Sequence, residues 1–348
     1  MRNYTNWRSG TPVYALNFSH WKKSVVRQCF PDARLVFVSD LAKVPHGAVL
    51  VVWGLAQVAE ALSRELTVLR LEDGFLRSVG LGADLIRPVS WVIDSVGIYY
   101  DATRPSQLEQ ILSTTEFSPA CLHRASILQA RIVGSGITKY NVGNAVWQRP
   151  AGIKKVILVP GQVESDASLR YGAPQICTNM GLLQAVRAAH QDAYIIYKPH
   201  PDVLAGLRAK GHGEDEALNW CDEQVTGVAM AALLDSVDEV QVLTSLTGFE
   251  ALLRNKAVTC YGQPFYSGWG LTTDKVANPR RQRRLSLAEL VAGALIEYPV
   301  YLSRFGPALI SPEQALDELV AWRNKDGGSN PWWREGFRMI LRQVVGVR

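Results

Sequence analysis

The sequence lacks the long apolar run and the leader that would take a chain into or across a membrane. No stretch of about 18 apolar residues occurs in the 348 residues, so no segment is expected to span a bilayer. The N-terminus, MRNYTNWRSG, has no apolar signal core, so export is not expected. The cysteines are odd in number and show no CxxC spacing: Cys29, Cys121, Cys177, Cys221 and Cys260. This pattern predicts reduced thiols in a cytoplasmic protein and no zinc site.

Two common nucleotide-binding fingerprints are also missing. The sequence has no GxGxxG dinucleotide motif and no GxxxxGK[ST] P-loop, which disfavours NAD and ATP chemistry. The net charge of +5 is too small to indicate nucleic acid by itself, and no nucleic-acid partner is expected. The basic excess collects late, in the last helix and at Arg280, Arg281, Arg283 and Arg284, which suggests anionic partners near one end.

The first half of the chain alternates short hydrophobic segments with helical patterns. Strands are predicted over Val13–Phe18, Arg34–Ser39, Val49–Trp53 and Leu66–Leu71, and helices over Trp21–Phe30 and Ala56–Arg64. Strands that alternate with helices at these lengths favour a parallel, doubly wound sheet. Next come a predicted strand pair around a turn, at Trp91–Ile93 and Gly97–Asp101, and helices from Pro105 and over Pro119–Val133.

The length favours two domains. Asn141–Gly152 is the predicted boundary, because the α/β pattern restarts at Val156–Val159. We therefore predict an α/β chain of two Rossmann-like domains, residues 1–150 and 151–310, with parallel sheets facing one cleft. Residues 311–348 are predicted as C-terminal helices. The last of them, Trp332–Val345, is cationic and Trp-rich, which fits both an anionic membrane surface and packing back on the first domain.

Polar side chains gather where predicted strands end, and in open α/β sheets ligands bind beyond the carboxyl ends of the strands. One such end, YKPHPD, carries Lys198 and His200. Two others carry acids: Glu72 and Asp73, and then Glu164 and Asp166. For each end a bland interpretation stays open, respectively a solvated turn, a helix N-cap with an Asp–Arg pair, and loop-solvating charges.

Two later segments add to this pattern. Ser245 and Thr247 begin a helix, where free N–H groups make a ready anion site, and Glu250 follows one turn later. A plain N-cap with a capping-box acid explains the same residues. The run GQPFYSGWG, which includes Trp269, is rich in aromatics and glycines. It fits either a loop that flanks a base or sugar ring or a packed surface loop.

Together these segments resemble the KpsC-type capsule β-Kdo glycosyltransferases, and the two halves resemble the GT-B architecture. The resemblance runs from about Val13 to Ser303 and is carried by EDGFLRSVGLG, GIYYDATRPSQLE, KYNVG, VPGQVESDAS, YKPHPD, TSLTGFEALLR and GQPFYSGWGLT. That family carries two such modules in tandem, and this chain has the length of one. The resemblance implies CMP-β-Kdo as donor, retention at the transferred sugar, and a poly-Kdo linker built on a phosphatidylglycerol-type lipid at the cytoplasmic membrane face.

The resemblance also implies roles for individual residues. His200 and Pro201 should contact the CMP phosphate and cytosine, Ser245 and Thr247 the phosphate, and Glu250 the ribose. Gln263 opens the family's QP motif, and we add Lys198 and Gln162 on the donor side. No metal cofactor is expected, because a helix dipole, Lys198 and His200 can supply the positive field. The residues predicted to line the cleft or hold the acceptor are Arg77, Ser78, Lys139, Tyr140 and Trp269.

Retention implies a double displacement through a glycosyl-enzyme adduct. Asp166 is our predicted nucleophile and Glu72 the predicted general base for the acceptor. Asp73 and Glu164 are the alternative candidates for the base. Two alternatives stay open: an inverting CMP-sugar transferase of sialyltransferase type, and a non-catalytic glycan- or nucleotide-binding module. The expected partners are a Kdo-terminated lipid-linked acceptor, the capsule biosynthesis machinery and an anionic membrane surface. The motifs do not fix the linkage, although the overall look favours the second of the two tandem modules.

Overall fold

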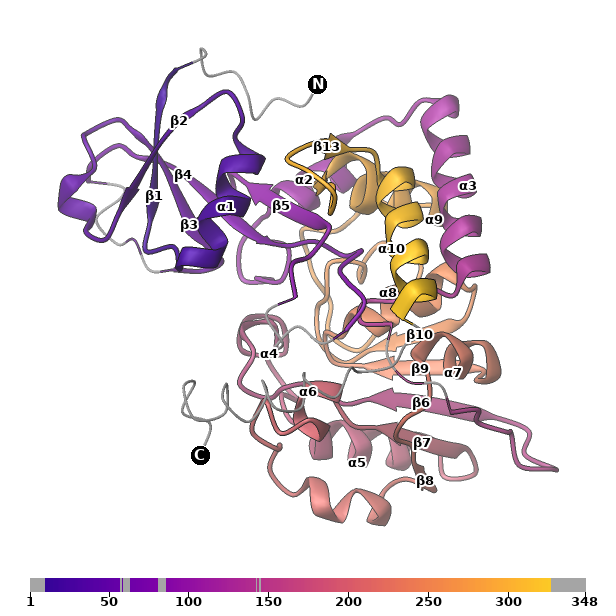
Figure 1. The fold of residues 1–348 in the computed structure, drawn as a ribbon. Coiled ribbons are helices and arrows are strands. Elements are labelled where there is room, and N and C mark those ends of the chain that lie inside the picture. Colours follow the sequence, from indigo (N-terminus) through magenta and orange to yellow (C-terminus); the bar gives the residue numbers. More distant parts are fainter. Residues whose placement is uncertain are drawn as a thin grey trace.

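The computed structural model describes residues 10–56, 58, 63–80, 86–141, 143 and 145–326. Over these residues the chain forms two β-sheets, one built mainly from each half, with helices packed around them (Figure 1). Within the described ranges no helix is long and apolar enough to cross a bilayer. The predicted helix Ala56–Arg64 falls mostly, and Trp332–Val345 wholly, outside the described residues.

The first sheet has seven strands in the order β13-β12-β5-β4-β3-β1-β2. β1, β2, β3 and β4 pair in parallel, as predicted. The bounds are β1 Pro12–Leu16, β2 Arg34–Val38, β3 Val49–Trp53, β4 Thr67–Asp73, β5 Ser90–Asp94, β12 Pro299–Leu302 and β13 Leu309–Ile310. Helix α1 (His20–Cys29) buries Val25, Val26 and Cys29 in the core cluster that includes Leu69, Leu71 and Trp91. The short 3-10 helix η2 spans Leu41–Lys43.

The predicted strand pair around residue 95 is wrong. β5 is a single strand that runs antiparallel to β4, and Gly97–Asp101 is a turn, so this sheet is mixed and not all parallel. The Asp94 carboxylate accepts hydrogen bonds from the backbone N–H groups of Val96 (2.8 Å) and Gly97 (2.7 Å), which bends the chain away from the sheet. A Cβ on Gly97 would lie 2.3 Å from the Pro105 carbonyl oxygen, so the turn has room only for glycine there.

The second sheet has six strands, all parallel, in the order β11-β10-β9-β6-β7-β8. Its central strands, β6, β7 and β9, are fully or mainly buried, which explains the apolar sequences of β6 and β7, while β9 also buries Glu239 and Gln241. The strands are β6 Val156–Pro160, β7 Tyr194–Lys198, β8 Glu223–Gln224, β9 Glu239–Val242, β10 Ala257–Cys260 and β11 Thr273–Asp274. The accompanying helices are α4 Ala167–Gly172, α5 Asn179–Ala189, α6 Pro201–Leu204, η5 Glu214–Asn219, α7 Met230–Ser236 and α8 Leu246–Leu253.

The chain then returns to the first half, earlier than predicted. β12 pairs antiparallel with β5, so the predicted second unit, 151–310, extends too far. Helices α9 (Leu287–Val291), η6 (Ala292–Glu297) and α10 (Pro312–Asp326) lie against α3 (Pro119–Ser135), as Figure 1 shows for α10. Arg124 of α3 forms an ion pair with Glu313 of α10 at 2.7 Å, and Arg131 forms another with Asp317.

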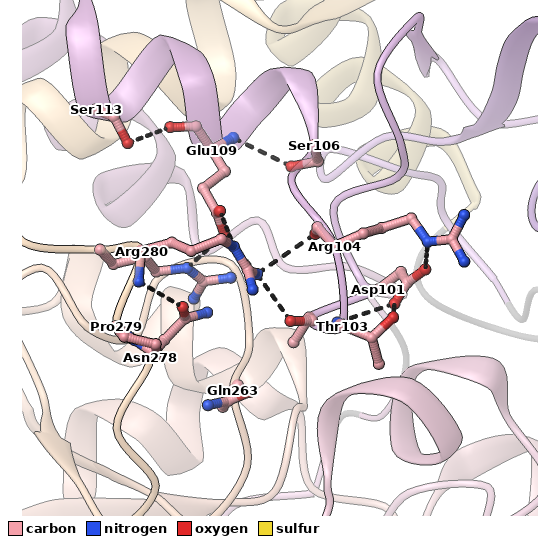
Figure 2. Close-up of polar contacts among 12 residues, drawn as sticks. Asp101, Thr103, Arg104, Ser106, Glu109, Ser113, Gln263, Asn278, Pro279 and Arg280 are labelled. Atoms are coloured by element: carbon pink, nitrogen blue, oxygen red, sulfur yellow. Dashed lines mark hydrogen bonds and ion pairs between the residues drawn. The ribbon is translucent and has the colours of Figure 1, made fainter.

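Three arginines of the late basic cluster, Arg280, Arg281 and Arg283, form ion pairs within the protein. Glu109 of α2 (Gln107–Thr114) accepts from Arg280 Nε at 2.6 Å (Figure 2). It also accepts from Arg281 Nε at 3.0 Å. Arg283 pairs with Glu289 at 2.6 Å. Glu109 and Arg281 are both buried, so each charge needs the other in place. The prediction of anionic partners for Arg280, Arg281 and Arg283 is therefore wrong, because carboxylates of this chain already pair with them.

Candidate active site

A cleft of about 650 Å³ lies between the two sheets, and strand ends from both sheets line it. The first sheet contributes the ends of β3 and β4, and the second sheet contributes the ends of β6, β7 and β9. This is the placement that the strand-end rule predicts. The predicted site residues that line the cleft are Glu72, Asp73, Arg77, Lys139, Tyr140, Gln162, Asp166, Lys198, His200, Pro201, Ser245, Thr247 and Glu250.

Two of the other predicted residues are structural. Glu164 accepts hydrogen bonds from the backbone N–H groups of Asn179 (2.8 Å) and His212 (3.1 Å), so its carboxylate holds the start of α5. Trp269 is fully buried and donates from Nε1 to the Phe265 carbonyl oxygen at 2.8 Å. Glu164 is therefore not a cleft carboxylate, and the loop of Trp269 is packed.

Gln263 and Ser78 also lie outside the cleft lining. Gln263, drawn in Figure 2, donates from Nε2 to the Ala277 carbonyl oxygen at 2.7 Å, and its backbone N–H donates to the Gly172 carbonyl oxygen at the same distance. Ser78 is buried, and its hydroxyl accepts from Arg77 Nη1 at 3.0 Å. Both residues support neighbouring segments and do not face the cleft.

The strand ends of the second sheet are locked together by one amide. Gln162 donates from Nε2 to Thr244 Oγ1 and accepts from the Thr244 backbone N–H, both at 2.9 Å. These two bonds join the end of β6 to the end of β9. Gly161 lets the adjacent end of β7 approach, because a Cβ there would lie 2.7 Å from the Tyr197 hydroxyl. The wall that we call the donor wall, residues 160–168, 198–208 and 244–250, is thus fixed before any ligand binds.

Ser245 is the N-cap of α8. Its hydroxyl oxygen accepts from the Thr247 backbone N–H at 3.2 Å and donates to Thr247 Oγ1 at 3.1 Å. The N-cap interpretation and the anion-site interpretation are compatible here, because the capped helix start lines the cleft. The N-terminal end of α8 adds a partial positive charge to the donor wall.

His200 is neutral in this site. Its Nδ1 accepts from the Asp202 backbone N–H at 3.1 Å, which leaves the ring proton on Nε2. Burial, with Lys139 and Arg208 nearby, lowers the pKa of His200 to about 3. The expectation that His200 adds positive charge is therefore wrong, and it can act only as a neutral hydrogen-bond donor. Lys198 donates from Nζ to the Val228 carbonyl oxygen at 2.8 Å, and burial lowers its pKa.

Glu250 connects the two halves. One of its carboxylate oxygens accepts from the backbone N–H of Lys139 at 2.6 Å. Burial raises the pKa of Glu250 to about 7, although the hydrogen bond from Lys139 and the charge of Arg254 act against the rise. Only the second carboxylate oxygen is left for a ligand hydroxyl, as the predicted ribose contact requires.

Three acids of the cleft, Glu72, Asp73 and Asp166, have different surroundings. Asp73 is paired with Arg77 Nε at 2.8 Å. Glu72 accepts from the Asp73 backbone N–H at 3.0 Å and from the Tyr100 hydroxyl at 3.4 Å, and burial together with the Asp73 charge raises its pKa to about 8. Asp166 stands before α4 but does not cap it with its side chain, and it is exposed to the cleft. Carboxyl groups that differ in burial and in hydrogen-bond partners suit different chemical roles.

Several cleft residues were not predicted. Trp21, Lys22 and Trp53 line the cleft on the side of Glu72, and Arg208 lines it on the donor wall. Trp53 is the last residue of β3, so the strand-end rule applied to Val49–Trp53 would have found it. Trp21 and Lys22 begin α1 just after β1, and the same rule extended to the loop after β1 would have included them.

Two sheets whose strand ends meet in one cleft define an α/β protein with a GT-B-like arrangement. The family model for capsule polysaccharide biosynthesis proteins matches residues 52–141 and 123–302. The chain therefore belongs to the capsule polysaccharide biosynthesis protein family, which confirms the resemblance found in the motifs.

Individual relatives agree with this assignment. The chain is 43% identical to capsule polysaccharide modification protein LipA of Neisseria meningitidis serogroup A over 95% of its own length but 49% of LipA. It is 40% identical to lipopolysaccharide-processing protein LpsZ of Rhizobium meliloti over 87% of its length and 73% of LpsZ. The chain thus spans about half the length of the LipA proteins that it matches.

Two solved structures have the same fold. The β-Kdo 2,7 transferase of Thermosulfurimonas dismutans KpsC is 42% identical, with a TM-score of 0.74. The β-Kdo 2,4 transferase of the same protein is 32% identical, with a TM-score of 0.78. In both comparisons the match covers 90% of this chain and 99% of the solved chain.

Proposed function

We propose that this chain is a retaining β-Kdo glycosyltransferase, which moves Kdo from CMP-β-Kdo to a Kdo-terminated lipid acceptor during capsule biosynthesis. The observation that supports this best is the position of Asp166. Its carboxylate lies on the donor wall of the cleft that Glu72 enters from the other sheet. The proposal is also supported by the two solved Kdo transferases that share this fold, at up to 42% identity.

The donor wall offers groups that suit a cytidine monophosphate. The phosphate would lie at the start of α8, with Ser245 and Thr247 close by, and would accept a hydrogen bond from His200 Nε2. Lys139 and Lys198 line the same space and would offset its charge. The free oxygen of Glu250 would accept from a ribose hydroxyl. In this proposal these groups, and not a metal ion, stabilise the charge that develops on the departing CMP.

The first step is attack by Asp166. A carboxylate oxygen bonds to the anomeric carbon of Kdo, while the bond from that carbon to the phosphate oxygen breaks and its electron pair leaves with CMP. The products are CMP and a Kdo ester of Asp166. Asp166 suits this role because its carboxylate does not cap α4 and is exposed to the cleft.

The second step is attack by the acceptor. A hydroxyl oxygen of the acceptor bonds to the anomeric carbon, its proton passes to the Glu72 carboxylate, and the ester bond to Asp166 breaks. Two inversions give net retention. Glu72 suits the role of base because burial raises the pKa of its carboxyl to about 8, which makes the carboxylate a stronger proton acceptor.

The linkage and the place of the reaction complete the proposal. The higher identity to the 2,7 transferase, 42% against 32%, favours a β-2,7 linkage. A lipid-linked acceptor places the reaction at the cytoplasmic face of the inner membrane, where the chain would bind as a peripheral protein. Linkage analysis of the product tests the first statement, and flotation with vesicles that contain phosphatidylglycerol tests the second.

The decisive experiment is an intact-mass measurement of the protein with CMP-Kdo from a Kdo-activating enzyme and no acceptor. The wild-type protein should gain the mass of one Kdo residue, and Asp166→Asn should not. Transfer by Asp166→Asn should fall by more than about 10³-fold. Glu164→Gln is the matched control, since Glu164 holds α5 and lies outside the cleft, and it should still form the adduct.

The other outcomes are also informative. An adduct in Asp166→Asn would move the nucleophile to another residue. Transfer with inverted configuration and no adduct would support an inverting CMP-sugar transferase. If the wild-type protein bound no CMP, the proposed donor site would be refuted, and a glycan-binding module would be the remaining candidate function.

A further inference from the structure

The cation of Lys22 lies over the ring of Trp53 and near that of Trp21, where residues of the first half line the cleft. Lys22 Nζ is 3.0 Å from the centroid of the Trp53 ring and 5.4 Å from that of Trp21. All three side chains are half-buried and line the cleft. Trp53 is held from behind by Trp91, with ring centroids 6.1 Å apart in an edge-on arrangement. The cation therefore sits on a supported aromatic surface and not on a mobile side chain in solvent.

The ammonium of Lys22 has no ion-pair partner in the part of the chain that the structure describes. Among the described residues Lys22 has no carboxylate within 4.0 Å. The nearest acids are Glu72 and Asp73. Asp73 is already paired with Arg77, and among the described residues no ion pair joins Lys22 to Glu72. A half-buried cation without a partner costs free energy unless a ligand supplies the anion.

The burial of Lys22 has a second consequence. Burial is the largest influence on the pKa of Lys22 and lowers it, while the charges of Glu72 and Asp73 act in the opposite direction. An anion bound against the ammonium would favour its charged form. The next residue along the helix differs: Lys23 lies 5.4 Å from the Phe37 ring centroid and does not line the cleft.

We propose that Lys22, Trp21 and Trp53 form an acceptor subsite for a sugar that carries a carboxylate. The Lys22 ammonium pairs with that carboxylate, and the indole rings pack against the apolar face of the sugar. The subsite rests on the proposed transferase function and makes it more specific. Glu72 lies beside the subsite in the cleft, so a hydroxyl of the bound sugar would reach the base. The acceptor is then recognised by charge as well as by shape.

The test pairs a change in the enzyme with a change in the acceptor. Transfer rates are measured with a soluble Kdo glycoside and with its methyl ester, which has the same shape and no carboxylate charge. For the free acid, Lys22→Gln should raise the acceptor KM about tenfold or more and change kcat less, because a charge-assisted contact is lost. Lys23→Gln, which removes a cation from the same helix, should leave KM within about twofold.

The ester decides whether Lys22 contacts the carboxylate. With the wild-type protein, the KM for the ester should exceed the KM for the acid by about the factor that Lys22→Gln causes with the acid. With Lys22→Gln, the KM values for the ester and for the acid should be equal. Adduct formation from CMP-Kdo without acceptor should be unchanged in Lys22→Gln, which also shows that the variant folds.

Each other outcome overturns something definite. If the wild-type protein uses the ester as well as the acid, no carboxylate is read and the subsite is refuted, whatever the variant does. If the ester raised KM by the same factor in the wild-type protein and in Lys22→Gln, another residue would bind the carboxylate. A wild-type protein that binds no CMP and transfers no Kdo would refute the proposed function itself.

Discussion

The two walls of the cleft are built differently. On the donor wall three polar side chains are already bonded, Gln162 at both ends of its amide, His200 at Nδ1 and Lys198 at Nζ, whereas Asp166 is exposed to the cleft. On the acceptor wall, which we define as Trp21, Lys22, Trp53, Glu72 and Asp73, Asp73 is paired with Arg77 and Glu72 accepts from the Asp73 backbone N–H. Glu72 has a long 3.4 Å contact with Tyr100, and Lys22 has no ion pair among the described residues.

This difference separates the binding of the donor from the proton transfer at the acceptor, while the proposed nucleophile, Asp166, lies on the donor wall. A prebonded wall suits one constant ligand, because its groups need no reorganisation when the ligand arrives. A wall with an unpaired cation and an acid of raised pKa suits proton transfer and the selection of an anionic partner. Burial changes a pKa on each wall. On the donor wall it lowers the pKa of His200 and keeps the ring neutral, and on the acceptor wall it raises the pKa of Glu72 and makes its carboxylate more basic.

On the acceptor wall the largest effect is expected from Glu72. Glu72→Gln should lower transfer by about 10²- to 10⁴-fold while the Kdo adduct still forms, because only the second step needs a base. Rapid-quench measurement of adduct formation and of its transfer to acceptor separates the two steps. Failure to form the adduct would place Glu72 in the first step and would erase the proposed division between the walls.

The matched control for this experiment is Glu164→Gln. Glu164 is also an acid near the end of a strand, but it holds the start of α5 through the backbone N–H of Asn179. We expect transfer to stay within about twofold and the free energy of unfolding to fall by about 1 kcal/mol, the usual cost of weakening a helix N-terminus. A large loss of transfer with normal stability would contradict the assignment of Glu164.

The next effect is a pH dependence of about tenfold. Since the base must be ionised, and the Glu72 pKa is raised to about 8, kcat/KM for the acceptor should rise about tenfold from pH 7 to pH 9. The rise should be absent in Glu72→Gln. His200, with a pKa of about 3, should not contribute a step near pH 6.5. Such a step, abolished by His200→Asn, would show that His200 is protonated in the working enzyme.

The smallest effect distinguishes two glutamines that sequence motifs place together on the donor side. Gln162→Ala removes both bonds to Thr244 and should weaken CMP binding about fivefold, the loss of about 1 kcal/mol. Gln263→Ala should leave CMP binding within about twofold, because Gln263 bonds to Ala277 outside the cleft lining. Isothermal titration with CMP measures both. The reverse order of effects would place Gln263, and not Gln162, at the donor site.

The donor wall was the easier part to predict from the sequence. Its residues lie in short segments that follow apolar strands, such as YKPHPD after β7, so local pattern and strand-end geometry point to the same place. The acceptor wall is assembled from the starts and ends of separate elements. Trp21 and Lys22 belong to the first turn of α1, where Trp21 also packs against the core cluster, and only the packing of α1 on the sheet brings them beside Glu72.

The mispredicted residues show why local pattern was insufficient. An acid after a strand can be a catalytic group, as proposed for Asp166, or can bind backbone N–H groups, as Glu164 does two residues earlier. An arginine run resembles an anion-binding surface until its partner is known, and Glu109 lies about 170 residues away along the chain. Likewise β12 is only four residues long, PVYL, and its partner β5 is distant in sequence.

The late return of β12 to the first sheet also sets the order in which a growing chain can fold. The six strands of the second sheet come from one continuous segment, Val156–Asp274, and can pair as soon as that segment is synthesised. The first sheet cannot, because β5 lacks its outer neighbour until Pro299–Leu302 emerges from the ribosome. The half of the protein that begins first is therefore completed last, and until then β5 exposes an open edge that can pair with other chains.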